Sequence, residues 1–288
     1  MATGAEATPV SAALGTVLEG KAFGDPSFTL YRWDRFPSIL ILDTVSFGFQ
    51  DRMFSRLAFF LEKRGFRGEL LSDGELQRMH GWNAHDYGSE GLASFFNAAK
   101  RTGFSLNDEE LTLRDIALAN GILRMTGDLY APGAGGVISI SRSSSAIERR
   151  LLLSHESFHG IFFASAEYRA FCFRLWDSLD LRAKAFFKKF LDELGYDTDY
   201  RYLVVNEFQA YLMQQSPRSA PEYFQRAMKR FGDVEAAVPV ETILKASQRL
   251  RSFLQERFGI LADITAGDSA MPFTRASGGS ASEPSGYR

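Results

Sequence analysis

The sequence is poor in the residues that form disulfides and metal sites, with one cysteine and four histidines among 288 residues. The single Cys172 excludes an intramolecular disulfide, and its neighbours Phe171 and Phe173 favour a small buried role for it. The formal net charge is only −2, which provides no strong field for nucleic acid or an anionic membrane. No apolar run approaches the roughly 20 residues that span a bilayer. We therefore expect neither a nucleic-acid partner nor a membrane span.

The cellular compartment stays open. The first residues lack the basic-then-apolar order of a signal peptide. One cysteine suits a cytoplasmic protein, and it equally suits an exported protein whose leader has been removed. The sequence does not determine the oligomeric state either.

Hydrophobic periodicity divides the chain into a mixed part and a helical part. We expect an α+β fold that is predominantly helical, with a small N-terminal sheet. The expected units are a flexible N-terminus (1–25), an α/β subdomain (26–145), a helical subdomain (146–265) and a disordered Gly/Ser-rich tail (266–288).

Amphipathic stretches and turn residues predict the individual elements. The apolar run at 39–43 is typical of a buried strand, and residues 137–141 alternate as a half-exposed strand would. The segment 80–87 is predicted to be a polar, aromatic loop. Helices are predicted over 50–64, 72–81, 90–101, 108–119, 146–164, 166–179, 181–194, 202–215, 221–231 and 240–258.

The strongest motif lies in the first helix of the C-terminal part, where His155-Glu156-Ser157-Phe158-His159 is flanked by apolar residues. A spacing of four places both imidazoles on one face of a helix, where two nitrogens can meet one tetrahedral Zn²⁺. Glu156 lies near that face but is angled away from it. It is therefore suited to take a proton from water and not to coordinate the metal. The alternative to a metal site is a buried helix whose histidines only form hydrogen bonds.

A catalytic zinc needs a third protein ligand, and Glu207 is the best candidate. It lies in the apolar segment 204–212, and a buried carboxylate there needs a cation. His155-Glu156-x-x-His159 followed by Asn206-Glu207-x-x-Ala210 resembles the gluzincin clan of metallopeptidases, the thermolysin- and aminopeptidase-like enzymes. The resemblance covers about 15 residues and implies one Zn²⁺ held by His155, His159 and Glu207, with Glu156 as the general base.

The chain departs from the pattern of the clan in one respect. Glu207 follows His159 by 48 positions, further than in the best-known members of the clan, and two predicted helices fill the gap. Rival third ligands lie closer in sequence but lack the Asn-Glu-x-x-Ala context: Glu167, Asp177 and Asp180.

Two further residues are candidates for catalysis. Tyr211, four positions after Glu207, could orient a zinc ligand, donate to a developing oxyanion or simply pack as an aromatic. His85 could donate to an oxyanion from its loop, or form structural hydrogen bonds there. His80 and His85 are five residues apart across a glycine, which is a poor spacing for one metal.

The expected function is a zinc-dependent hydrolase that cleaves peptide bonds in a peptide or protein substrate, a peptidoglycan peptide being a narrower option. The strand at 137–141 would bind that substrate in extended form, or it is an ordinary edge strand. Two alternatives remain. One is a catalytically silent zinc-binding scaffold or interaction protein with a gluzincin-like fold, and the other is a helical interaction protein with a coincidental motif.

Overall fold

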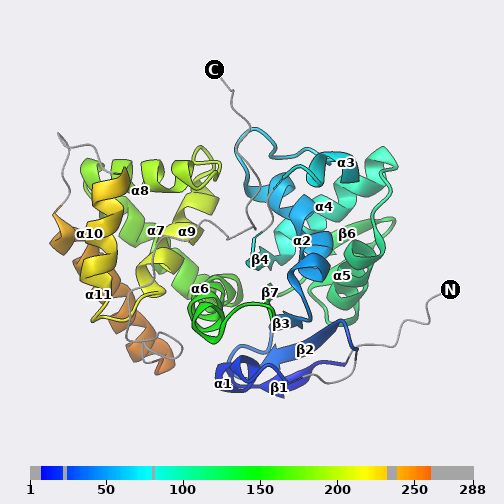
Figure 1. Ribbon diagram of the computed structural model, residues 1–288, viewed down its shortest axis with the longest axis horizontal. Helices are drawn as coiled ribbons and strands as arrows, with labels where there is room; N and C mark the ends of the chain where they lie inside the picture. The colour runs from blue at the N-terminus through cyan, green and yellow to red at the C-terminus, as the bar shows by residue number, and fades with distance from the viewer. Residues whose placement is uncertain (1–7, 22–24, 80–81, 232–238, 261–288) are drawn as a thin grey trace.

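The computed structural model describes residues 8–21, 25–79, 82–231 and 239–260. Over these residues the chain forms a mixed sheet with helices on both of its faces, followed by a helical half (Figure 1). The α+β, predominantly helical expectation is therefore confirmed. The expected tail at 266–288 lies outside the described residues, as do residues 1–7 of the expected flexible N-terminus.

The main sheet contains parallel and antiparallel neighbours. Strands β1 and β2 pair in parallel, β2 and β3 antiparallel, β3 and β7 in parallel, and β7 and β4 antiparallel. The order across the sheet is therefore β1-β2-β3-β7-β4. The strands are β1 (Val10–Ala12), β2 (Phe28–Trp33), β3 (Ile39–Thr44), β4 (Ala84–Gly88) and β7 (Gly136–Ser141).

Successive side chains of a strand point to opposite faces of the sheet, and each face packs against its own hydrophobic core. Ile39 and Ile41 of β3 contribute to the core on the side of the C-terminal helices. Leu40 and Leu42 point the other way, into a second core with the N-terminal helices. The sheet is thus covered on both faces. This explains why β3 is an uninterrupted apolar run, as predicted for a buried strand.

The N-terminal helices end and begin at recognisable signals. Ser46 caps one of them by accepting a hydrogen bond from the backbone of Phe49. Asn107 and Glu110 form a reciprocal capping box at another. These elements are α1 (Leu14–Leu18), α2 (Phe47–Glu62), α3 (Asp73–Leu76), α4 (Ser89–Thr102), α5 (Asp108–Ala119) and the hairpin β5 (Leu123–Thr126) and β6 (Leu129–Pro132).

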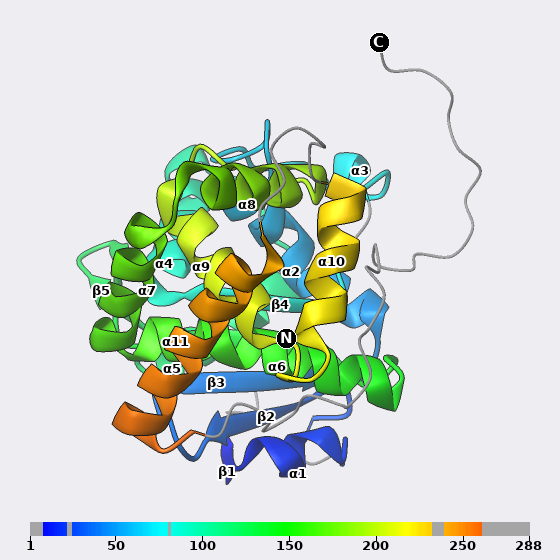
Figure 2. The same cartoon turned by 90° about the vertical axis from the view of Figure 1, so that its left-hand side faces the viewer.

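The C-terminal helices follow the predicted pattern to within about two residues at each end. Figure 2 shows α11 running across the stack that α7 and α9 form, with α6 nearer the sheet. The C-terminal helices are α6 (Ala146–Ala164), α7 (Ala166–Ser178), α8 (Leu181–Glu193), α9 (Arg201–Met213), α10 (Ala220–Phe231) and α11 (Val240–Phe258).

The prediction of an edge strand at 137–141 is wrong. Strand β7 lies inside the sheet between β3 and β4, and all six of its residues are buried. The polar residues Ser139 and Ser141 made this strand look half-exposed in the sequence. In the structure, Ser139 accepts a hydrogen bond at 3.0 Å from the Gln50 side chain of α2, so its polar group is buried beneath that helix and is satisfied there. The edge is formed by β4, within the segment predicted to be a loop.

The expectation of a flexible N-terminus is also wrong for part of the segment. β1 extends the sheet by pairing with β2, and α1 follows it. Ala12, Leu14 and Val17 are buried in the core shared with the C-terminal helices. The small, polar residues around them concealed this short apolar face.

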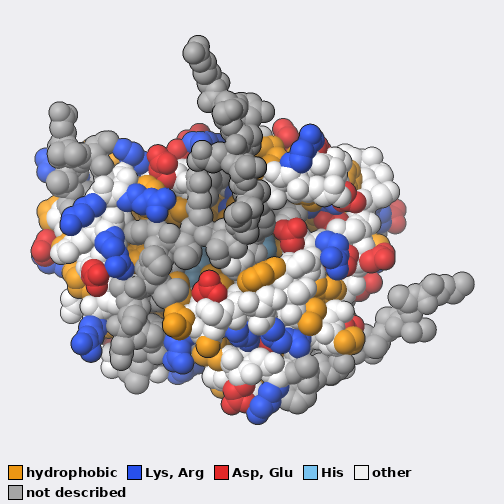
Figure 3. Space-filling view, in the orientation of Figure 1, with side chains coloured by type: hydrophobic (Ala, Val, Ile, Leu, Met, Phe, Trp, Pro, Cys, Tyr) orange, Lys and Arg blue, Asp and Glu red, His pale blue; other side chains and the backbone are white. Residues whose placement is uncertain are grey.

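The surface shows no dominance of one charge. On the face drawn in Figure 3, basic and acidic side chains are interspersed over the described residues. Among the described helices, none combines the length and the apolar character needed to cross a membrane.

Candidate metal centre

Helix α6 carries the two histidines on its buried face. Its N-terminus is fixed by a capping box, in which Ser145 accepts from the Glu148 backbone and Glu148 accepts from the Ser145 backbone. His155 is 8% exposed and His159 is fully buried. A helix of this length holds two side chains four residues apart in a fixed relation, so the motif is rigid at its base.

Helix α9 packs against α6 and supplies the carboxylate. Nearly every residue from Leu203 to Met213 is buried, so this helix lies in the middle of the C-terminal half. Glu207 is 1% exposed, and its side chain lies beside both histidines. The structure therefore brings Glu207 to the motif despite the long separation in sequence.

Potential ligand atoms of the three side chains lie close together. The Nε2 atoms of His155 and His159 are 3.0 Å apart. Glu207 places one carboxylate oxygen 3.6 Å from Nε2 of His155 and the other 3.8 Å from Nε2 of His159. Taking one ligand atom from each residue, the three atoms lie within 4.8 Å of one another, and the ligand atoms of a tetrahedral site with bonds of about 2.1 Å lie about 3.4 Å apart.

The other ring nitrogen of each histidine faces an oxygen. Nδ1 of His155 lies 2.9 Å from Oε1 of Gln214, whose amide nitrogen donates to the Tyr223 hydroxyl at 2.8 Å. The oxygen can only accept, so Nδ1 is the donor of this contact, and in the neutral ring Nε2 is then the nitrogen with the lone pair. Nδ1 of His159 lies 3.4 Å from Oδ2 of Asp86, a contact that is long for a hydrogen bond.

Asp86 is itself held by the sequence motif that contains Glu207. The Asn206 side chain donates to Oδ2 of Asp86 at 3.2 Å. The two residues of the Asn-Glu pair thus have different roles. Glu207 faces both histidines, while Asn206 holds Asp86, the β4 residue beside His159. Oxygen partners of this kind orient histidine ligands in metal sites.

The electrostatics of the site call for a cation. Burial, partly offset by the charge of Glu207, lowers the pKa of His159 to about 4. Burial opposes ionisation of Glu207, yet the neighbouring His159 and His155 lower the pKa of its carboxyl overall. Among the described residues, Oε2 of Glu207 has no hydrogen-bond donor. Two lone pairs and a carboxylate converge here, and a divalent metal would satisfy all three.

Glu156 lies on the same part of α6. Its carboxylate, one ring nitrogen of His159 and a carboxylate oxygen of Asp86 all lie within 4.8 Å of one another. Burial and then the charge of Glu207 raise the pKa of Glu156 well above its usual range. Its Oε2 has no hydrogen-bond donor among the described residues. Glu156 therefore lies beside the candidate ligands and binds a proton more tightly than an ordinary glutamate does.

The structure does not bring the rival third ligands to the histidines. Glu167 forms an exposed ion pair with Arg257 at 2.8 Å. Asp177 pairs with Arg201 at 2.6 Å, and both of those side chains are more than half exposed. Asp180 caps α8 by accepting from the Ala183 backbone at 2.7 Å. Each of these carboxylates already has a partner elsewhere on the C-terminal helices.

Of the two further catalytic candidates, the structure brings one to the site. The Tyr211 ring lies 4.7 Å from the His155 ring between centroids. His85 precedes Asp86 on β4 and so points to the opposite face of the sheet. There it stacks on Phe54 at 5.1 Å and lies 3.0 Å from the Tyr87 hydroxyl, so it is not brought to the metal ligands.

Sequence reasoning missed several residues around the site. Gln214 could have been found, because it lies seven positions after Glu207 and therefore on the same face of α9. Nothing in the sequence indicated that Asp86 lies at the site, since its segment was predicted to be a loop. Nothing indicated it for Lys63 either. Its ammonium is buried 3.8 Å from the Trp82 ring centroid and 4.0 Å from that of Tyr196, with Glu62 at 3.6 Å.

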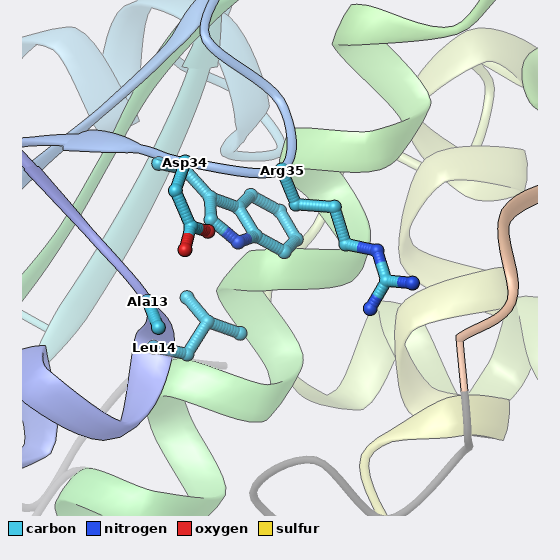
Figure 4. A pocket seen from close by; sticks show the side chains of 5 residues that line it. Ala13, Leu14, Asp34 and Arg35 are labelled. Carbon is cyan, nitrogen blue, oxygen red and sulfur yellow. The ribbon is translucent and has the colours of Figure 1, made fainter.

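A separate cavity of about 400 Å³ lies near the N-terminal strands (Figure 4). Ala13, Leu14, Asp34 and Arg35 line it together with Trp33. It contains none of the candidate metal ligands, so it is distinct from the metal centre.

Comparisons of the chain with models of protein families, with curated proteins and with solved structures found no match.

Proposed function

We propose that the protein is a zinc-dependent hydrolase that cleaves peptide bonds. The observation that carries this proposal is the convergence of Nε2 of His155, Nε2 of His159 and the Glu207 carboxylate within 4.8 Å of one another. Two nitrogen ligands and one oxygen ligand suit Zn²⁺, and three protein ligands leave a fourth position for a reactant. The gluzincin-like pair of sequence motifs supports the same assignment.

The side chains around the metal centre have complementary roles in such a reaction. Zn²⁺ at this site would polarise the scissile carbonyl and lower the pKa of water. Glu156 accepts the proton of the attacking water and passes it to the leaving amine. The pKa of Tyr211 is raised well above its usual range by burial and then by the charge of Glu207, so its phenol stays protonated and can donate to an oxyanion.

The substrate would lie along β4 instead of the strand that the sequence indicated. β4 is the last strand of the sheet over the described residues, so one side of its backbone has no strand partner. An extended peptide can pair with such an edge whatever its sequence. Asp86 joins this edge to the metal centre, because its side chain lies beside His159.

Metal content and peptide hydrolysis test the proposal. Purified protein should contain about one zinc per chain, and His155→Ala should lose it. Glu156→Gln should retain zinc and lose hydrolysis of a broad peptide library, since the metal ligands are untouched. The proposal fails if wild-type protein holds no zinc and His155→Ala changes neither metal content nor stability.

A catalytically silent zinc-binding scaffold is the second candidate. The observation that favours it is burial, since Glu156 is only 4% exposed and His155 only 8%. Under this alternative the wild-type protein would bind zinc but turn over no member of the peptide library. Zinc content and turnover measured on one preparation separate the two candidates.

A further inference from the structure

A cavity of about 300 Å³ adjoins the metal centre. Two of its lining residues, Asp86 and Asn206, are those that support His159. It lies between the edge strand β4 and the first turns of α4 and α9. This volume is at the small end of ligand sites, so it suits one side chain and not a whole peptide.

The position of the cavity along α6 relates it to the metal centre. Phe163 forms part of its wall, and it follows His159 by the same four residues that separate His159 from His155. One helical turn, about 6 Å, therefore separates the cavity wall from the nearer histidine. Side chains two residues apart in an extended peptide are about 7 Å apart. A substrate lying along β4 would thus place a nearby side chain here.

Two glycines leave the space that the Phe163 ring occupies. A Cβ on Gly88 of β4 would lie 3.0 Å from this ring, and one on Gly136 of β7 would lie 2.9 Å from it. The ring therefore occupies space that side chains would fill on neighbouring strands. The cavity wall next to β4 is therefore an aromatic ring packed closely against the backbone of two strands.

The lining carries more acid than base. Its carboxylates are Glu62, Asp86 and Glu90, against the single guanidinium of Arg67. Arg67 already has an acidic partner outside the lining, since it lies 3.5 Å from Asp197.

Internal partners account for two of the three carboxylates. Glu62 lies beside Lys63, and Asp86 accepts from Asn206. Glu90 is exposed and accepts from the Ser89 hydroxyl at 3.2 Å. Among the described residues, Glu90 forms no ion pair with a basic side chain, so its charge is available to a substrate.

The aromatic walls suit a cation as well. Tyr200 and Tyr202 line the cavity beside Phe163, and the Arg67 guanidinium lies 3.7 Å from the ring centroid of Tyr200. Such faces attract ammonium and guanidinium groups, while the rings pack against the methylene stems that carry them.

We propose that this cavity is a specificity pocket that takes a basic side chain, lysine or arginine, of the peptide substrate, with Glu90 as its anionic anchor. This proposal rests on the proposed peptidase function. It names the substrate class of that site, which the metal centre alone leaves undefined.

Equilibrium binding tests the pocket without relying on turnover. Zinc-loaded Glu156→Gln protein is titrated with N-acetylated, C-amidated pentapeptides that carry lysine, arginine, norleucine or glutamate at one scanned position. At one position, lysine and arginine should bind about tenfold more tightly than norleucine. Glu90→Gln should remove most of that preference and leave norleucine binding unchanged. The matched control Glu222→Gln, on the remote α10, should keep the preference.

Several outcomes would overturn the pocket. Norleucine could bind as tightly as lysine at every position, or Glu90→Gln could leave the preference intact. If the acetylated peptides do not bind and the same peptides with a free N-terminal amine do, the cation site serves a chain terminus instead. If wild-type protein cleaves peptides without a basic preference, the pocket fails and the proposed function stands. If basic peptides bind but wild-type protein cleaves none, the pocket stands and the proposed function fails.

Discussion

The amide oxygen of Gln214 lies 2.9 Å from Nδ1 of His155 and leaves Nε2 as the lone-pair nitrogen of that ring. We expect Gln214→Ala to weaken zinc binding about 10- to 100-fold, the usual range for an orienting partner. Gln214→Glu retains an acceptor oxygen and should recover most of the affinity. Competition with a zinc chelator measures both variants. Equal loss in the alanine and glutamate variants would contradict an orienting role for this oxygen.

A second prediction concerns the third ligand. Glu207→Gln removes the carboxylate charge beside the two histidines, and we expect it to weaken zinc binding by more than about 100-fold, beyond the range of orienting residues. Glu167→Gln is the matched control, since Glu167 was a rival in sequence but pairs with Arg257 on the surface. Zinc content after dialysis should fall in the first variant and match wild type in the second. The reverse result would move the third ligand to α7.

The third prediction concerns pH and His85, which lies on the opposite face of the sheet from Asp86. Burial, followed by the charge of Lys63, lowers the pKa of His85 to about 3 in the folded protein. Its unfolded value is about 6.5, so between pH 6.5 and 3 the unfolded state binds more protons, and stability falls as pH falls. From pH 7 to pH 5 this one group should cost about 2 kcal/mol.

Denaturant unfolding of metal-free protein at the two pH values measures this cost. His85→Phe should shrink the difference between pH 7 and pH 5 by that amount. For each protein the free energy of unfolding at pH 5 is subtracted from its own value at pH 7, so a change in stability that is the same at both pH values cancels. An undiminished difference would show that His85 can be protonated in the folded state.

The fourth prediction concerns the turn before β7. Gly135 has a φ of +76°, and a Cβ there would lie 2.0 Å from the backbone oxygen of Ser38. We expect Gly135→Ala to lower the free energy of unfolding by about 3 kcal/mol or more, since strain and a backbone clash add. Gly127 has a φ of +58° with open space around it, so Gly127→Ala should cost only about 1 kcal/mol. Urea unfolding of both variants separates the clash from the backbone conformation.

The helices and the candidate metal ligands could be predicted from the sequence because their signals are local. The period of apolar residues and the capping residues such as Ser145 gave the helices of the C-terminal half. The spacing of His155 and His159 is likewise a property of one helix. Glu207 was found through its short motif together with its apolar flanks.

The remainder depends on contacts between distant segments. Whether β7 is an edge or an interior strand depends on β4 pairing with it, and no local pattern in 84–88 shows this. Ser139 resembled a solvent-facing residue because its partner, Gln50, lies far away in the sequence. Asp86 was overlooked for the same reason, since its role exists only once strand and helix meet.

The place of β7 between β3 and β4 also has a consequence for the order of synthesis. Both neighbours of β7 leave the ribosome before it does, so the sheet has a gap until residues 136–141 emerge. Until then β4, which carries Asp86, has no strand to pair with. The helix with both histidines begins only at Ala146, directly behind the strand that closes the gap. The edge strand and the helix with both histidines should therefore become structured together, and the candidate metal centre is complete only after α9 with Glu207 has also emerged.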